Sequence, residues 1–122
     1  MPYSTVGKNL MLDALRGTNP TVAIAYASLH TASPGDTGTN EVRGGSPSYA
    51  RKGITIAAAS GGEVAASTQP VFDVPGGTTV THVGFWSAVS GGTFLGSADV
   101  TDETFASQGT YTLTSATLDL NS

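Results

Sequence analysis

The chain has 122 residues and no cysteine, and its nine acidic and five basic side chains give a formal net charge of −4. This length favours one domain over residues 1–122. The few basic residues argue against a nucleic-acid or anionic-membrane partner, and the lack of cysteine excludes disulfides, thiol catalysis and cysteine-ligated zinc. We expect no secretory signal and no membrane span, because no apolar stretch approaches ~20 residues.

A short helix is predicted at the N-terminus, over about residues 4–17. Ser4 is a suitable N-cap, and Gly17 suits the position after the helix, where the backbone often adopts a positive φ. The apolar residues that recur at helical spacing are Val6, Leu10, Met11, Ala14 and Leu15.

The pattern from residue 21 to about residue 121 indicates β-strands. Strands are expected over 21–31, 49–57, 69–74, 80–87, 93–99 and from 110 onward, with Gly-Gly pairs at the turns between them. Leu29 falls out of alternation, which predicts a bulge near Ala27-Ser28, and a phase change at Ser115-Ala116 predicts a bend between sheets. We therefore predict a mainly β protein, a small antiparallel β-sandwich of jelly-roll or immunoglobulin-like type with one short N-terminal helix.

The triplet Asp36-Thr37-Gly38 matches the catalytic triplet of aspartic proteases. Turn residues precede it and polar residues follow it, whereas a protease loop joins apolar strands, so a protease dimer is a remote alternative. The favoured interpretation is a long polar turn in which Asp36 and Asn40 bond the local backbone. The loop lacks the ligand pattern of a calcium site, and we predict no metal, no cofactor and no catalytic residue.

Four residues of the predicted strands need a separate interpretation. His30 and His82 have no third metal ligand beside them, so ordinary hydrogen-bonded histidines are expected. Trp86 lies in a strand that is apolar on both faces, and we expect it to be either a core residue or an interface anchor. Gly84 in the same strand indicates a bulge or a close backbone approach.

Several motifs together resemble a family of small bacteriophage virion proteins. They are Leu29-His30-Thr31, Pro34-Gly35, Gly38, Asn40-Glu41-Val42, Gly44-Gly45-Ser46, Tyr49-Ala50-Arg51, Thr81-His82, Gly84-Phe85-Trp86 and Ser90-Gly91-Gly92. The chain is similar over nearly its whole length to tail fibre-like, minor tail and accessory capsid (decoration) proteins of the actinobacteriophage type.

This resemblance implies a non-enzymatic structural protein of the virion, assembled in the cytoplasm of the host bacterium. It implies a homo-oligomer, with a trimer favoured, that contacts major capsid or tail proteins. Low charge agrees with self-association. The candidate interface residues are Leu29, His30, Asn40, Glu41, Tyr49, Arg51, His82 and Trp86. The alternative is a host-surface-binding module, which would present aromatic side chains on loops. The sequence leaves open whether the protein lies on the head or the tail. It also leaves open whether the His30–Gly45 loop binds an ion or a neighbouring subunit.

Overall fold

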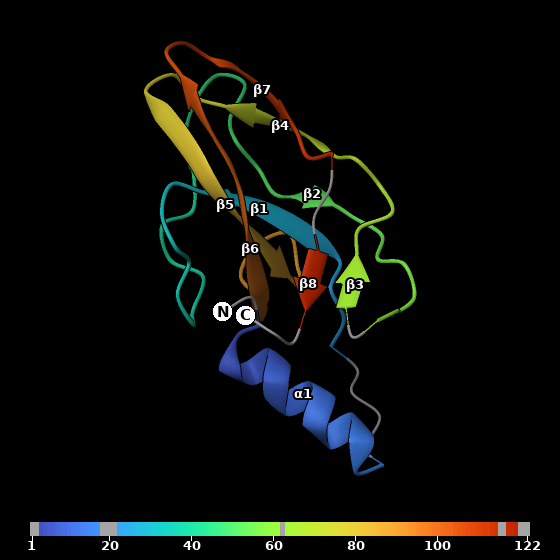
Figure 1. The fold of residues 1–122 in the computed structure, drawn as a ribbon. Helices are drawn as coiled ribbons and strands as arrows, with labels where there is room; N and C mark the ends of the chain where they lie inside the picture. Colours follow the sequence, from blue (N-terminus) through green and yellow to red (C-terminus); the bar gives the residue numbers. More distant parts are fainter. Residues whose placement is uncertain (1–2, 18–21, 62, 115–116, 120–122) are drawn as a thin grey trace.

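The computed structural model describes residues 3–17, 22–61, 63–114 and 117–119. Within these ranges one helix is followed by strands that pair antiparallel (Figure 1). The elements are α1 (Thr5–Leu15), β1 (Tyr26–His30), β2 (Lys52–Gly53), β3 (Glu63–Ala65), β4 (Val71–Val74), β5 (Thr78–Trp86), β6 (Phe94–Phe105), β7 (Gly109–Thr112) and β8 (Thr117–Asp119). The prediction of a mainly β, antiparallel protein with one short N-terminal helix is confirmed.

The largest sheet has four strands in the order β2-β1-β5-β6, while β3-β8 and β4-β7 form two-stranded ribbons. β1 pairs with β5 without a register shift, from Tyr26 opposite Trp86 to His30 opposite His82. The bulge predicted near Ala27-Ser28 is therefore wrong, and the register shifts lie between β5 and β6. The physical reason is that β1 begins only at Tyr26, so the alternation before it does not belong to the strand.

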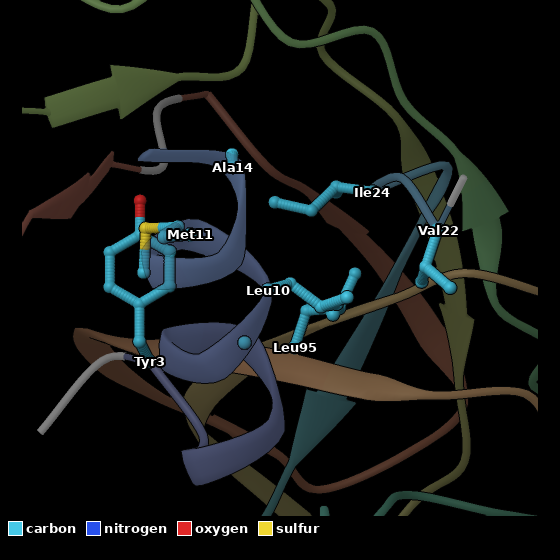
Figure 2. Close-up of a pocket in the computed structure, with 8 residues that line it drawn as sticks. Tyr3, Leu10, Met11, Ala14, Val22, Ile24 and Leu95 are labelled. Atoms are coloured by element: carbon cyan, nitrogen blue, oxygen red, sulfur yellow. The ribbon is translucent and has the colours of Figure 1, made fainter. Parts of the chain in front are cut away.

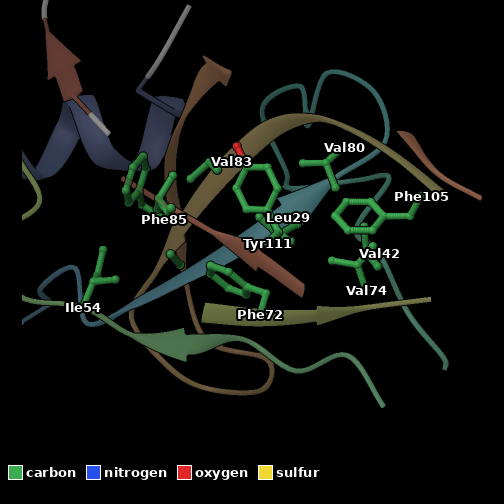
Figure 3. Close-up of a cluster of buried hydrophobic side chains, with 12 residues drawn as sticks. Leu29, Val42, Ile54, Phe72, Val74, Val80, Val83, Phe85, Phe105 and Tyr111 are labelled. Atoms are coloured by element: carbon green, nitrogen blue, oxygen red, sulfur yellow. The ribbon is translucent and has the colours of Figure 1, made fainter. Parts of the chain in front are cut away.

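The hydrophobic core lies between one face of the four-stranded sheet and the β4-β7 ribbon (Figure 3). Side chains at alternate positions of β1 and β4, and of the second half of β5, point into it, as a pleated strand requires. Its buried members are Ala27, Leu29, Val42, Ile54, Phe72, Val74, Val80, Val83, Phe85, Phe105, Tyr111 and Leu113. Burial of this apolar surface is the main favourable contribution to folding.

The helix α1 lies at one end of the molecule (Figure 1). As predicted, Ser4 is its N-cap, with Oγ accepting from the backbone N–H of Gly7 at 3.0 Å, and Gly17 follows with a φ of 99°. The Ser4 hydroxyl also donates to the carbonyl of Phe94 at 2.7 Å, and its backbone N–H donates to Leu95 O at 3.0 Å. The first turn of α1 is thus fastened to β6. The described part of the chain has no helix long and apolar enough to cross a membrane.

The later strands differ from their expected limits. The strand expected over 49–57 is reduced to β2. β6 continues beyond its expected limit to Phe105, and the sequence did not indicate this outer half because it carries exposed polar residues without an apolar alternation. β7 pairs with β4 and β8 pairs with β3, so the C-terminal run does change sheets. Ser115 and Ala116, where the phase changes, lie outside the described residues. The single domain over residues 1–122 stays a prediction.

Candidate functional site

Arg51 is the centre of a polar cluster beside β1 and β5. Its guanidinium donates to both carboxylate oxygens of Glu41, at 3.0 and 2.9 Å. It also donates to the carbonyls of Ala88 at 3.1 Å and Gly91 at 2.9 Å, and Cζ lies 3.6 Å from the ring centroid of Trp86. Bidentate, charge-assisted contacts of this kind are among the strongest polar interactions in proteins. Arg51 therefore ties the 31–51 segment to β5 and to the turn that follows it.

The hydroxyl of Tyr49 connects this cluster to β1. It donates to Glu41 Oε2 at 2.8 Å and accepts from the backbone N–H of Leu29 at 2.9 Å. The ring stacks against Phe72 of the core, with centroids 6.3 Å apart. Burial, together with the Glu41 carboxylate, raises the pKa of Tyr49, so its hydroxyl remains a donor at neutral pH. The Tyr49 hydroxyl thus accepts a hydrogen bond from the β1 backbone at Leu29, beyond the two residues of β1 that pair with β2.

A second series of hydrogen bonds runs beneath the Trp86 ring. Trp86 Nε1 donates to Ser28 Oγ at 2.8 Å, Ser28 Oγ lies 2.6 Å from His30 Nε2, and His30 Nδ1 lies 2.7 Å from Thr39 O. Because a carbonyl only accepts, His30 Nδ1 carries the proton and Nε2 accepts from the Ser28 hydroxyl. Burial lowers the pKa of His30 and keeps the ring neutral. Each of these groups has a partner, so the series is complete.

Ser28 and His30 lie at the distance of a nucleophile and its general base, but they are enclosed. Both residues are 0% exposed. An added Cβ at Gly84 would come within 2.5 Å of Ser28 Oγ, and one at Gly38 within 2.5 Å of the Trp86 ring. The backbones of β5 and of the covering loop therefore approach these side chains closely. The arrangement holds the loop on the sheet and leaves no substrate access at this pair.

Asp36 of the Asp-Thr-Gly triplet lies at the start of α1. Its Oδ1 accepts from the backbone N–H of Thr5 at 2.7 Å and from the Thr5 hydroxyl at 3.0 Å. The first turn of α1 has no acidic residue of its own, so Asp36 supplies the negative charge that a helix N-terminus favours. The expected polar turn is present, with Gly35 at φ 63° and Gly38 at φ 81°. The expectation that Asp36 bonds the local backbone is wrong, because the loop folds against the start of α1 and the carboxylate accepts from Thr5. In the described ranges no group of three or more His, Cys, Asp or Glu could hold a metal ion.

Most of the candidate interface residues lie together in this network. They are Leu29, His30, Asn40, Glu41, Tyr49, Arg51 and Trp86, and the contacts described for them are within the chain. Asn40 adopts a φ of 65° and donates to Ser33 O at 3.0 Å. His82 is paired with His30 in the β1–β5 register, but its side-chain partners are outside this network, with Nε2 2.7 Å from Asp99 Oδ1 on β6. A contact between subunits at these residues stays a prediction.

Two structural features were not found from the sequence. Ser28 was not singled out, although its position two residues before His30 places both on one face of a strand. The exposure of the apolar side chains of α1 was not foreseen either, because helical spacing alone indicates a face and not what covers it.

The fold and the network define a small antiparallel β protein whose polar cluster serves its own structure. The family model described as Podophage GP4 fiber I protein gp80 matches residues 2–121. The chain therefore belongs to this family of phage fibre proteins, and the predicted resemblance to virion structural proteins is confirmed at that level. No curated protein sequence matches the chain.

Proposed function

We propose that the chain is a non-enzymatic structural subunit of a phage tail fibre that associates with itself and with other virion proteins. The observation that carries the proposal is the fibre-family match over residues 2–121. Supporting it, the guanidinium of Arg51 makes its hydrogen bonds within the chain, which suits a structural role for this cluster. A minor tail or capsid-decoration location, and the actinobacteriophage type, are finer predictions that accompany the proposal.

The chain's presence in the virion is tested on purified particles. Mass spectrometry of the particles, followed by antibody labelling in electron micrographs, should detect the chain and place it on the tail. A chain that is expressed during infection but absent from particles would contradict the proposal. Labelling on the head in place of the tail would favour the capsid-decoration role.

A trimer is the oligomer that we propose for the fibre. Sedimentation or light scattering of the purified protein should give three times the 12.2 kDa of one chain. A dimeric mass would contradict the trimer but not self-association.

The absence of catalysis is tested at Asp36. We expect no peptidase activity on unfolded substrates in the wild type, and assembly of Asp36→Ala into particles whenever the variant folds. A wild-type activity that disappears in Asp36→Ala would establish the protease alternative.

Host-surface binding is a second candidate function, and the loops at the end opposite α1 favour it (Figure 1). Gln108 joins two of these loops, with Oε1 accepting from Ser46 N and Nε2 donating to Pro47 O, both at 3.1 Å. Such an end would contact the cell first if α1 faces the particle. However, every aromatic side chain of the chain is buried or partly buried, so loop aromatics for sugar stacking are not present. Binding of labelled protein to host cells, weakened in Gln108→Ala, would support this function, and no binding would contradict it.

A further inference from the structure

The helix α1 exposes large apolar side chains. Val6 is 49%, Leu12 63% and Leu15 85% exposed, and Val22 in the segment after the helix is also exposed. Elsewhere in the described residues the strongly exposed large apolar side chains are only Val71 and Val89. Single exposed apolar residues are ordinary on soluble proteins, whereas a concentration of them marks an interaction surface.

An open apolar groove runs between α1 and the β-strands. A first part of about 200 Å³ lies between the inner face of α1 and residues Val22, Ile24 and Leu95 (Figure 2). A second part of about 580 Å³ continues from Met11 and Ile24 along Ile54, Ile56 and Val64. Among the described residues, none of those that line either part is charged. Val6, Leu12 and Leu15 do not line the groove, and Leu12 lies on the side of α1 that is turned away from it. We call the groove, together with these three protruding side chains, the α1 surface.

The helix cannot rely on its own stability to hold this arrangement. It has 11 residues, below the ~12–15 at which isolated helices become marginally stable in water. Its first turn is held by Ser4 on β6 and by Asp36, so its direction is set before any partner binds. A helix held in this way is a preorganised binding element, which lowers the entropic cost of association.

We propose that a second copy of this chain covers the α1 surface, so that neighbouring fibre subunits associate through α1 and the groove beside it. This inference rests on the proposed function, since a fibre places identical subunits side by side. The same chain carries both protruding apolar side chains, Leu12 and Leu15, and an apolar groove that can receive such side chains.

The charges also favour a second copy over other occupants. Asp13 and Arg16 pair with each other on α1 at 2.9 Å, and no described residue that lines the groove is charged, so apolar side chains of a second copy can enter it without desolvating a charge. The outer part of β6 carries Asp99, Asp102 and Glu103, and two copies of that edge would repel each other. A lipid surface would call for a helix rich in Lys and Arg, which α1 is not.

The test compares the solution mass of the full-length wild type with that of Leu12→Gln/Leu15→Gln. Glutamine keeps helix propensity while removing the apolar side chains. In sedimentation velocity over a range of concentrations, the wild type should be oligomeric and the variant should approach the 12.2 kDa of one chain. The matched control is Val71→Gln/Val89→Gln, which removes two exposed apolar side chains away from α1 and should keep the wild-type mass. Fluorescence of Trp86, which lies in the Arg51 cluster and not on α1, verifies that each variant keeps a folded β body.

Three results would overturn the inference. They are an unchanged mass in Leu12→Gln/Leu15→Gln, an equal loss of mass in the control variant, and a wild type that stays monomeric at every concentration. A monomeric wild type that sediments with phosphatidylcholine vesicles would assign the α1 surface to lipid instead. Detection of the chain in particles together with an unchanged mass would overturn this inference alone, whereas absence from particles contradicts the proposed function.

Discussion

Gly84 occupies a place in β5 where a side chain of any size would collide with its neighbours. The register sets it opposite Ser28 on β1, and both Ser28 Oγ and His30 Nε2 lie over its Cα. The series of hydrogen bonds that runs from Trp86 through Ser28 and His30 to the Thr39 carbonyl passes beside this position. Close packing of this kind makes even one added carbon costly, because neither partner can move without leaving a buried polar group unpaired.

We expect Gly84→Ala to lower the free energy of unfolding by about 1–3 kcal/mol, the usual cost of overpacking a close-packed site. Urea denaturation followed by Trp86 fluorescence measures it. Gly53→Ala is the matched control, because its added Cβ would meet nothing closer than 3.9 Å, and it should change stability little. Equal stability of the Gly84→Ala protein and the wild type would refute the packing explanation.

His30 should make stability fall in mild acid. Burial lowers its pKa in the folded protein below the ordinary value of 6.5 that applies when the chain is unfolded. Above pH 6.5 both states are neutral and nothing is lost. As the pH falls below 6.5 the unfolded chain takes up a proton that the folded chain refuses, so stability declines by at most about 1.4 kcal/mol per pH unit. Denaturation curves between about pH 7 and 5 measure this slope.

The slope should shrink in His30→Asn, which is less stable overall but has no imidazole. It should persist in His82→Gln, because that histidine lies outside the enclosed series. A slope unchanged by His30→Asn would show that another group causes it.

At the scale of elements, the 31–51 segment is held on the sheet by side chains in addition to a short backbone pairing with β1, in which Val42 N donates to Leu29 O at 2.9 Å. Glu41, Tyr49 and Arg51 form one hydrogen-bonded group that reaches the β1 backbone and the Trp86 ring. A loop of this length in a small protein needs such anchors to be ordered. The Arg51 side chain is 9% exposed, so its ion pair is protected from solvent screening.

We expect Arg51→Lys to destabilise the protein by about 2–4 kcal/mol, because lysine cannot donate in a planar fork to Glu41 while lying on Trp86. Trp86 emission should shift as the ring becomes exposed to water. Arg43→Lys is the control, since Arg43 is exposed in the same segment and the change should cost less than about 0.5 kcal/mol. An Arg51→Lys protein as stable as the control would show that the fork contributes little.

Asp36→Ala should loosen α1 while sparing the β body. Removal of the carboxylate that caps Thr5 should cost the helix about 0.5–1 kcal/mol, and Asp36→Asn, which keeps an acceptor oxygen, should cost less. Helical circular dichroism and hydrogen exchange of the α1 amides measure the effect. Unchanged protection of these amides in Asp36→Ala would contradict the capping role.

Local signals predicted the elements well and the contacts between them poorly. The limits of α1 follow from Ser4 and Gly17, because capping is decided by neighbouring residues. The outer half of β6 was missed because it is polar on both faces and is a strand only through its pairing with β5. Glu41 and Arg51 were identified as important, but their contact with each other depends on how the chain folds back, which no short pattern encodes.

At the scale of the whole molecule, the two ends differ in chemistry. Apolar side chains gather on α1, while the opposite end consists of turns rich in glycine and small polar residues (Figure 1). The β-rich class was predictable from composition and alternation. The difference between the two ends was not predictable, because it depends on which side chains the folded chain leaves exposed.

If subunits associate through the α1 surface, thermal stability should depend on protein concentration. Because association stabilises the folded state by mass action, the midpoint of thermal unfolding should rise as concentration rises. This dependence should disappear in Leu12→Gln/Leu15→Gln and persist in Val71→Gln/Val89→Gln. Differential scanning calorimetry over a hundred-fold range (~10 to ~1000 μM) measures it, and a wild-type midpoint independent of concentration would contradict the expectation.

The capping of α1 by Asp36 has a mechanical consequence. If a neighbouring subunit pulls on α1, the force reaches the sheet by two routes, one through Ser4 into β6 and one through Asp36 into the loop that covers Trp86. Both routes end on the same four-stranded sheet. We therefore expect a fibre that is attached through α1 to resist pulling better than one whose helix is held by a single contact.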